Sequence, residues 1–508
     1  MFTIADNTTV IILLIALGII AWGYYRSRSY GKLGFLSWLQ SVALMAPWLL
    51  FFALAAAGVY LNLVSILAFF LVSTGLYIIL GRRLREAASQ INQDSLNSPP
   101  QINSNETKPN DSESSTPEYA STDSDVANPV GDSFPTQLAP LPEEDLETIR
   151  GIFGIDTFFA TETLPYQEGV IFKGNLRSDP EKAYNRLSDN LHSATGDRFR
   201  LFLVESPEGK PVVIVLPRSN DPNTATTGQR ILSIILLIIT IATTFEAGGL
   251  LLGFDFFTET SRYGEIFPIA IGVLAVLLSH ELAHQIIANK HQVKFSWPFF
   301  IPTVQIGTFG AFNRFESLLP NRKVLFDVAF AGPAAGGLLS LGMLFTGLVL
   351  SNDSSLFKVP VEFFRGSALV GILSKTILGS ALNQSVVAVH PLTIIGWLGL
   401  VITAINLMPA GQLDGGRIMQ AIYGRKVAGR STIATFAVLA IASLVNPLAL
   451  YWAVVILILQ RNLERPSLNE LVEPDDTRAA LGLLALFLMI ITLFPLTPVL
   501  ASRLGIGG

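Results

Sequence analysis

The sequence contains no cysteine, so disulfide bonds and cysteine-ligated metal sites are both excluded. Any metal ion must be held by histidine and carboxylate side chains. Charged residues are also scarce, at 14% of the 508 residues, and their formal net charge is −5. Because proteins that bind nucleic acids usually present excess positive charge, this balance argues against a nucleic-acid partner. The missing cysteine does not fix the cellular compartment.

Hydrophobic residues are abundant where charged ones are few. They account for 50% of the sequence, and the mean hydropathy is +0.49. These values are typical of a membrane protein rather than of an average soluble chain. The composition therefore predicts a polytopic α-helical membrane protein embedded in a lipid bilayer.

Three apolar runs predict an N-terminal membrane region of three helices in residues 1–85. The runs cover residues 10–24, 36–60 and 64–80. No basic residue precedes the first run, so we expect a retained anchor rather than a cleaved signal peptide. Basic clusters follow the first and third runs. By the positive-inside rule, the N-terminus then lies outside and the chain after the third run lies inside.

Residues 86–142 have the composition of a linker. They are rich in Ser, Asn, Pro, Asp and Glu, and Lys108 is the only basic residue between Arg85 and Arg150. Such a stretch cannot bury enough apolar surface to offset the entropy that ordering would cost. We therefore expect a disordered acidic linker here.

Residues 143–220 have the pattern of a small soluble α+β module. One helix is expected from its start, and Ser178-Asp179-Pro180 is a typical N-cap for a second helix. Two β-rich stretches, 200–204 and 211–215, flank a glycine-containing turn and predict a hairpin. His192, at the end of the second helix, is interpreted as a surface residue.

His280, Glu281 and His284 stand inside an apolar stretch, residues 267–287, that is long enough to cross a bilayer as a helix. Helical spacing puts the two imidazoles on one face, one turn apart, where both can bind one metal ion. The adjacent carboxylate is suited to take a proton from water. Each ionisable group at such depth costs roughly 2.5 to 3.5 kcal/mol, so three together indicate a compensating role such as metal binding.

A second polar group ends the apolar run 392–408. It extends from Asn406 to Arg417, and Pro409 and Gly411 break the helix there. Asp414 puts a carboxylate at the membrane boundary. Two histidines, one carboxylate and water form a complete catalytic zinc shell, so Asp414 is the expected third ligand. An ordinary turn at the end of a span is the alternative interpretation of this Asp-Gly-Gly sequence.

The rest of the predicted core, residues 229–465, alternates spans with broken segments. Residues 293–320 are hydrophobic but rich in Pro and Gly, which predicts a re-entrant hairpin that lines the site, or alternatively an interfacial aromatic belt. Residues 324–350 predict a further span that Asp327 and Pro333 interrupt.

Two more segments complete the expected membrane part. Small residues at 331–337 would allow another helix to approach closely. The stretch 368–382 is left unassigned between spanning and lying flat. The C-terminal segment, residues 466–508, is expected to contain the final transmembrane helix.

The two polar groups together resemble the site-2 protease family of intramembrane zinc metalloproteases. The motifs are His280-Glu281-x-x-His284 and Asn406-x-x-Pro409-x-x-x-x-Asp414-Gly415. Gly174-Asn175-Leu176-Arg177 and Val389-His390-Pro391-Leu392 are similar to the plastid and cyanobacterial branch that includes the ethylene-dependent gravitropism-deficient proteins. The resemblance covers residues 174–466.

This resemblance implies that His280, His284 and Asp414 bind Zn²⁺, that Glu281 is the catalytic acid and base, and that Asn406 stabilises the oxyanion. It also implies a transmembrane protein substrate and a broken-helix protease core. The expected location is a cyanobacterial cell or thylakoid membrane, or a plastid membrane. The PDZ domain that many family members carry is not seen in this sequence.

The residue types predict peptide-bond hydrolysis by metal-activated water with a glutamate base. The hairpin at 293–320 is a candidate edge to which an unwound substrate adds as a strand. Two other classes stay open, a catalytically silent scaffold or chaperone of the same fold and a metal transporter. Retention of both histidines, Glu281 and Asp414 argues against the first, and the clustering of these groups at one depth argues against the second. His291 and His390 are left outside the site, and the oligomeric state is not predicted.

Overall fold

The computed structural model describes residues 141–508, except 167, 207, 445, 461, 507 and 508, and scattered residues between 18 and 83. The chain forms two units, residues 1–130 and 131–508, each described here by itself. The described residues of the first unit are helical, and the expected N-terminal spans lie mostly outside them. The expected linker lies outside them except for its last two residues.

The second unit begins with an α+β module of two helices and one four-stranded antiparallel sheet in the order β1-β2-β4-β3. The first hairpin, β1–β2, was not predicted from the sequence, whereas both helices and the hairpin β3–β4 were. The elements are α4 (Glu143–Arg150), β1 (Phe158–Tyr166), β2 (Gly169–Leu176), α5 (Pro180–Thr195), β3 (Phe199–Glu205) and β4 (Pro211–Pro217).

Helix α5 forms where the sequence predicts it. The carboxylate of Asp179 accepts hydrogen bonds from the backbone N–H groups of residues 181 and 182, and proline occupies the first turn. Leu187 and Leu191 face the sheet and pack with Phe172 and Leu201 in the module's core. His192 is exposed at the end of this helix, as expected.

The membrane part follows, with four helices that are long and apolar enough to cross a bilayer among the described residues. They are α6 (Thr227–Leu251), α7 (Tyr263–Lys290, extended by η3 to Thr260), α8 (Arg322–Leu350) and α14 (Asp476–Leu493). These agree with four of the predicted spans. Helix α8 runs without interruption through Asp327 and Pro333, in contrast to the sequence prediction.

The remaining elements complete this part of the chain. They are η2 (Arg218–Asn220), η3 (Thr260–Arg262), β5 (Phe299–Thr303), β6 (Gly307–Phe312), β7 (Phe357–Pro360), α9 (Glu362–Arg365), α10 (Ala368–Leu378), η4 (Gly379–Asn383), β8 (Val386–Val389), α11 (Pro391–Asn406), α12 (Asp414–Ala442), α13 (Pro447–Leu459) and α15 (Pro498–Arg503). The segment left unassigned by the sequence is α10 with η4. At about 1.5 Å per residue, α10 is too short to cross a bilayer of about 30 Å.

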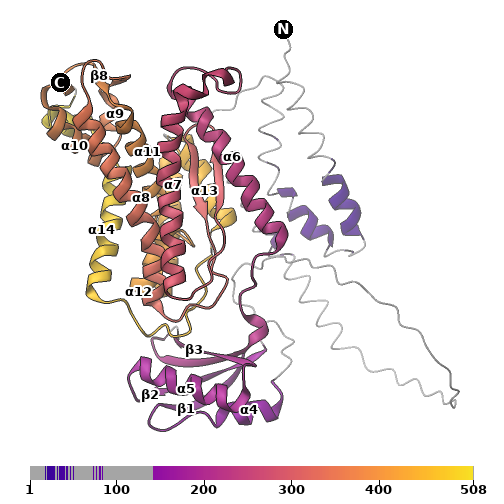
Figure 1. Ribbon diagram of the computed structural model, residues 1–508. Coiled ribbons are helices and arrows are strands. Elements are labelled where there is room, and N and C mark those ends of the chain that lie inside the picture. The colour runs from indigo at the N-terminus through magenta and orange to yellow at the C-terminus, as the bar shows by residue number, and fades with distance from the viewer. Residues whose placement is uncertain are drawn as a thin grey trace. The chain divides into compact units, whose positions relative to one another are not determined.

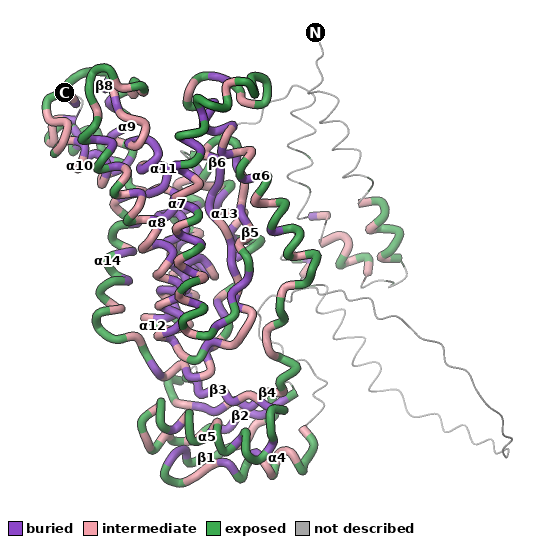
Figure 2. The backbone as a smooth tube through the Cα atoms, viewed as in Figure 1, coloured by how far each residue is buried: buried purple, intermediate pink, exposed green. Residues whose placement is uncertain are grey.

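Helices α7, α8, α11 and α12 pack together, with the hairpin β5–β6 beside them (Figure 1). Buried residues are concentrated where these elements meet, and many residues on the outward faces are exposed (Figure 2). On α7, the apolar side chains of Leu278, Leu282 and Ile286 are exposed at i, i+4 and i+8. An exposed apolar stripe on a helix this hydrophobic is suited to contact lipid.

The hairpin β5–β6 is fastened to α6 through its backbone carbonyl groups. Ser233 Oγ donates to the carbonyl of Pro298 at 2.6 Å, and Thr243 Oγ1 donates to that of Gly307 at 2.7 Å. Strands β5 and β6 pair antiparallel, so the hairpin predicted in residues 293–320 is present. Its depth in a bilayer stays a prediction.

Residues 464–473 join the module to the membrane part. The N–H of Leu203 in β3 donates to the carbonyl of Leu468, and the N–H of Glu470 donates back to the carbonyl of Leu203. Asn469 Nδ2 donates to the carbonyl of Pro180 at the start of α5, at 3.0 Å. The same segment bonds to the carbonyl groups of Leu319 and Pro320 before α8.

Asn469→Ala should weaken this junction, because it removes a buried donor and leaves the Pro180 carbonyl without that partner. We expect a loss of about 1 kcal/mol and faster amide hydrogen exchange in β3 and at the start of α5. Hydrogen-exchange mass spectrometry of the full chain measures this. Asn352→Ala, in the exposed turn that follows α8, is the control. Equal amide protection of β3 in the two variants would contradict the assignment.

Candidate metal centre

His280 and His284 lie one turn apart on α7, and Asp414 is the first residue of α12. Their ligand atoms converge, with 3.1 Å between the two Nε2 atoms, 3.1 Å from His280 Nε2 to Asp414 Oδ2, and 3.4 Å from His284 Nε2 to the same oxygen. All three side chains are buried. Among the described residues this is the group of histidine and carboxylate side chains suited to hold a metal ion.

These distances fit a tetrahedral zinc shell. Two ligand atoms that each lie about 2.1 Å from a tetrahedral zinc ion are roughly 3.4 Å apart. His284 Nδ1 lies 2.7 Å from the carbonyl oxygen of Val328, which can only accept, so Nδ1 carries the hydrogen. The lone pair of His284 is then on Nε2, the atom that faces the other two ligand atoms.

The position of Asp414 at the start of α12 favours its charged form. Unpaired backbone N–H groups at a helix N-terminus stabilise a nearby negative charge. Gly415 and Gly416 allow this turn to fold tightly, because a Cβ at either position would meet backbone atoms of residues 407–411 at less than 3 Å. The Asp-Gly-Gly sequence therefore directs a carboxylate to the two imidazoles, the arrangement that the third-ligand interpretation requires.

Helix α8 passes directly behind the imidazoles. A Cβ added at Gly332 would lie 2.1 Å from His284 Nε2, and one added at Gly336 would lie 3.2 Å from His280 Nδ1. The expected close approach at the small-residue stretch 331–337 is thus present, and its neighbours are the candidate ligands themselves.

Glu281 is buried beside the three candidate ligands, and among the described residues one side chain bonds to it. Asn313, the residue after β6, donates from Nδ2 to Glu281 Oε2 at 2.6 Å. No residue in the described part of the chain donates a hydrogen bond to Oε1. One carboxylate oxygen is therefore held and the other is left for water.

Asn406, at the end of α11, is buried against the hairpin. Its Nδ2 donates to the carbonyl groups of Phe309, at 3.1 Å, and Ile402, at 2.9 Å. Gly310, with φ at +104°, makes this approach possible because a Cβ there would lie 2.5 Å from Nδ2. The amide is thus close to the hairpin, and both of its hydrogens are used within the protein.

Sequence reasoning missed Asn313 and the ion pair behind it. Arg417 donates to the backbone carbonyl of Asn313 at 2.6 Å and pairs with Glu464 at 3.0 Å. Both charged side chains are buried. The sequence does show two charged residues close to apolar segments. Because the partners are 47 residues apart, the sequence alone does not indicate that they pair.

The remaining residues that the sequence singled out lie elsewhere. His291 Nε2 is 3.2 Å from Asp327, and His390 caps α11 by accepting from the N–H of Leu392. Both lie outside the candidate site, as expected. Gly174 lies in β2, where a Cβ would be 2.2 Å from the Phe159 carbonyl oxygen, so this part of the Gly-Asn-Leu-Arg motif serves strand pairing.

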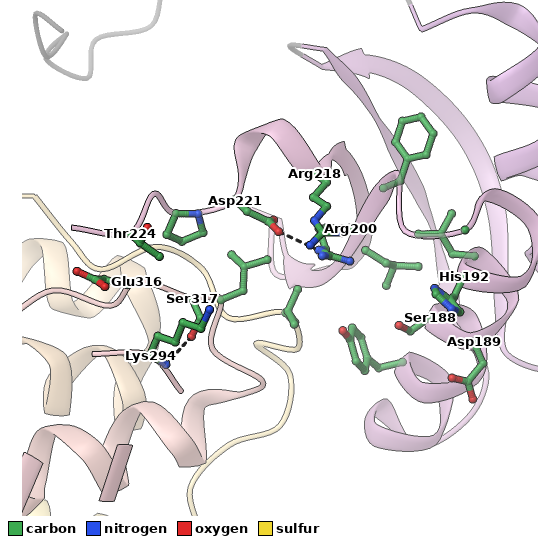
Figure 3. A pocket seen from close by; sticks show the side chains of 18 residues that line it. Ser188, Asp189, His192, Arg200, Arg218, Asp221, Thr224, Lys294, Glu316 and Ser317 are labelled. Atoms are coloured by element: carbon green, nitrogen blue, oxygen red, sulfur yellow. Dashed lines mark hydrogen bonds and ion pairs between the residues drawn. The ribbon is translucent and has the colours of Figure 1, made fainter. Parts of the chain in front are cut away.

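A hollow of about 620 Å³ lies between the module and the membrane part, away from the three ligands (Figure 3). Its arginines are already paired. Arg200 pairs with Asp221 at 3.1 Å and with Asp197 at 2.7 Å, and Arg218 pairs with Asp197. The hydrogen bond from Arg200 holds the pKa of the Asp197 carboxyl below its ordinary value. The two arginines of the hollow therefore offer little free positive charge to a ligand.

Gly332→Ala should displace the imidazoles, because the added methyl group would overlap His284 and His280. We expect zinc to bind at least about 10-fold more weakly, as measured by zinc content after dialysis against a graded chelator series. Gly342→Ala on the same helix is the matched control, since a Cβ there meets no atom within 4 Å. Equal zinc retention in the two variants would contradict the geometry.

Comparison with known proteins identifies relatives of the part of the chain that carries the candidate ligands. The family model described as Peptidase family M50 matches residues 268–446, and one described as the EGY3 middle domain matches residues 147–222. No solved structure matches.

Three curated relatives are plant proteins. The probable zinc metalloprotease EGY1, chloroplastic, of Oryza sativa subsp. japonica is 37% identical over 72% of this chain and 69% of its own length. The protein of the same name from Arabidopsis thaliana is 36% identical over 74% of this chain and 76% of its own length. The probable zinc metalloprotease EGY2, chloroplastic, of Arabidopsis thaliana is 39% identical over 70% of this chain and 65% of its own length.

These matches and the four apolar helices support a zinc-dependent integral membrane enzyme of plastid type. The cyanobacterial alternative stays a prediction. By its sequence similarity to these relatives, the chain belongs to the M50, or site-2 protease, family of zinc metalloproteases, in the group that contains the EGY proteins.

Proposed function

We propose that this zinc metalloprotease cleaves membrane-embedded protein substrates at a centre formed by His280, His284 and Asp414, with Glu281 as general base. The observation that carries this proposal is the convergence of three buried ligand atoms within 3.4 Å of one another, next to a carboxylate with one free oxygen. A zinc ion held there supplies Lewis acidity, which acidifies water and polarises a carbonyl group.

Glu281 then moves the proton. Its Oε1 accepts a proton from the attacking water, and the resulting carboxylic acid gives that proton to the departing amine. Oε2 stays engaged by Asn313, so the carboxylate keeps its orientation through both transfers. Burial of this group excludes bulk water, which strengthens each of these electrostatic interactions.

Asn406 is proposed to stabilise the developing oxyanion. Its Nδ2 now donates to the carbonyl groups of Phe309 and Ile402. A substrate carbonyl that takes the place of the Phe309 carbonyl would receive the same donor as charge develops on it. This role requires a small shift between α11 and the hairpin.

The hairpin β5–β6 is proposed to receive the substrate. It is a sheet of two strands, and no third described strand pairs with it. A helical substrate shields its own amides, so a segment must unwind before it can be cleaved. Addition of that segment to a hairpin edge would satisfy its backbone hydrogen bonds next to Glu281 and Asn406.

The two other classes are less well supported. A metal transporter needs ionisable groups spread along a path across the bilayer, whereas the candidate ligands lie together on α7 and at the start of α12. A catalytically inactive scaffold has no chemical use for three candidate ligands beside a carboxylate that is hydrogen-bonded through only one oxygen, Glu281 Oε2.

Glu281→Gln should abolish cleavage of a transmembrane reporter while zinc stays bound, because the amide cannot accept the proton. We expect a fall in kcat of at least about 100-fold, measured with purified protein, with zinc content unchanged. Glu265→Gln, near the exposed start of the same helix, is the matched control. Cleavage by both variants would exclude the proposed base, and metal transport without cleavage would support the transporter.

A photo-crosslinker at Val304, which is exposed at the turn of the hairpin, should capture a transmembrane substrate in the Glu281→Gln background. Val349, exposed at the far end of α8, is the control position. Mass spectrometry of the adducts identifies the captured segment. If substrate is captured at Val349 but never near the hairpin, strand addition is wrong.

A further inference from the structure

Asn313 is held on two sides next to the candidate active site. Its Nδ2 donates to Glu281 Oε2 at 2.6 Å, and its backbone carbonyl accepts from Arg417 Nη2 at the same distance. The residue is 93% buried, since 7% of its surface is exposed. Asn313 therefore links a carboxylate on α7 to a guanidinium on α12, from a position directly after β6.

The orientation of this amide is determined by its neighbour. A carboxylate oxygen only accepts, so the amide nitrogen of Asn313 must face Glu281. The amide oxygen, Oδ1, is then turned away, and this buried atom has no hydrogen-bond partner among the residues that the structure describes. Burying an unpaired acceptor costs on the order of 1 to 3 kcal/mol, so this orientation is maintained against a penalty.

Arg417 fixes the backbone at this point. Its guanidinium pairs with Glu464 and lies over the rings of Phe295 and Phe315, 5.7 and 5.0 Å from their centroids. These rings belong to the two arms that lead into and out of the hairpin. The arginine therefore joins α12, the hairpin arms and the segment after α13.

We propose that Asn313 is a positioning residue that orients the Glu281 carboxylate for proton transfer, and that the Arg417–Glu464 pair holds Asn313 in place. A carboxylate on a helix can rotate about its side-chain torsions. A short, charge-assisted hydrogen bond to one oxygen restricts that rotation and keeps Oε1 available. This inference rests on the proposed role of Glu281.

The test uses Asn313→Leu in the full chain, because leucine has nearly the same size but no N–H donor. We expect kcat for a transmembrane reporter to fall about 10- to 100-fold, with KM within about two-fold and zinc content unchanged. In the Glu281→Gln background the same substitution should cause no further loss of kcat. A purely structural role would instead lower zinc content or add to the loss.

A second pair of variants covers the case in which Asn313→Leu fails to fold. Arg417→Met with Glu464→Met removes the buried ion pair as a unit, so neither charge is left alone. Arg322→Met with Glu473→Met is the control. This half-exposed pair joins α8 to residue 473, and Arg322 also donates to the carbonyl groups of Ala421 and Ile422, but neither side chain bonds to Asn313 or Glu281. We expect kcat to fall roughly 10-fold in the first double variant and to stay unchanged in the second.

One further measurement separates failure of this inference from failure of the proposed function. In metal-free protein, the denaturation midpoints of Glu281→Gln, Asn313→Leu and the double variant form a cycle that needs no catalysis. Non-additive shifts of the denaturation midpoint support the contact even if no reporter is cleaved. Additive shifts, or full kcat in Asn313→Leu, overturn the inference.

Discussion

Three ionisable side chains are buried side by side in an apolar helix bundle, and the rest of the structure depends on how they are accommodated. Two imidazoles and a carboxylate within 3.4 Å of one another have little reason to be buried together without a cation. The hydrogen bond from His284 to Val328 directs one lone pair inward, and the start of α12 favours the charge on Asp414. The glycines of α8 leave the space that these side chains occupy.

The same polar region connects the site to the soluble module. Glu281 is held by Asn313, Asn313 by Arg417, and Arg417 by Glu464. Glu464 opens the segment whose residues 468–470 pair with β3 of the module. These contiguous contacts form a physical link between the module and the Glu281 carboxylate.

Much of the site could be predicted from sequence, because its signals are local. The spacing of His280 and His284 fixes a common helix face, and the break before Asp414 marks a carboxylate at the end of a span. Asn313 carries no such signal, since its role depends on how the hairpin packs on α7. Pro333 was expected to interrupt α8, but the helix continues through it, since tertiary packing overrides local propensity.

X-ray absorption at the zinc edge of the purified full chain would report the ligands of the metal ion itself. We expect one zinc per chain, with two imidazole nitrogens and oxygen ligands at about 2.0 to 2.2 Å, and loss of one protein oxygen ligand in Asp414→Ala. A zinc shell without two imidazoles, or one that is identical in Asp414→Ala, would contradict this expectation.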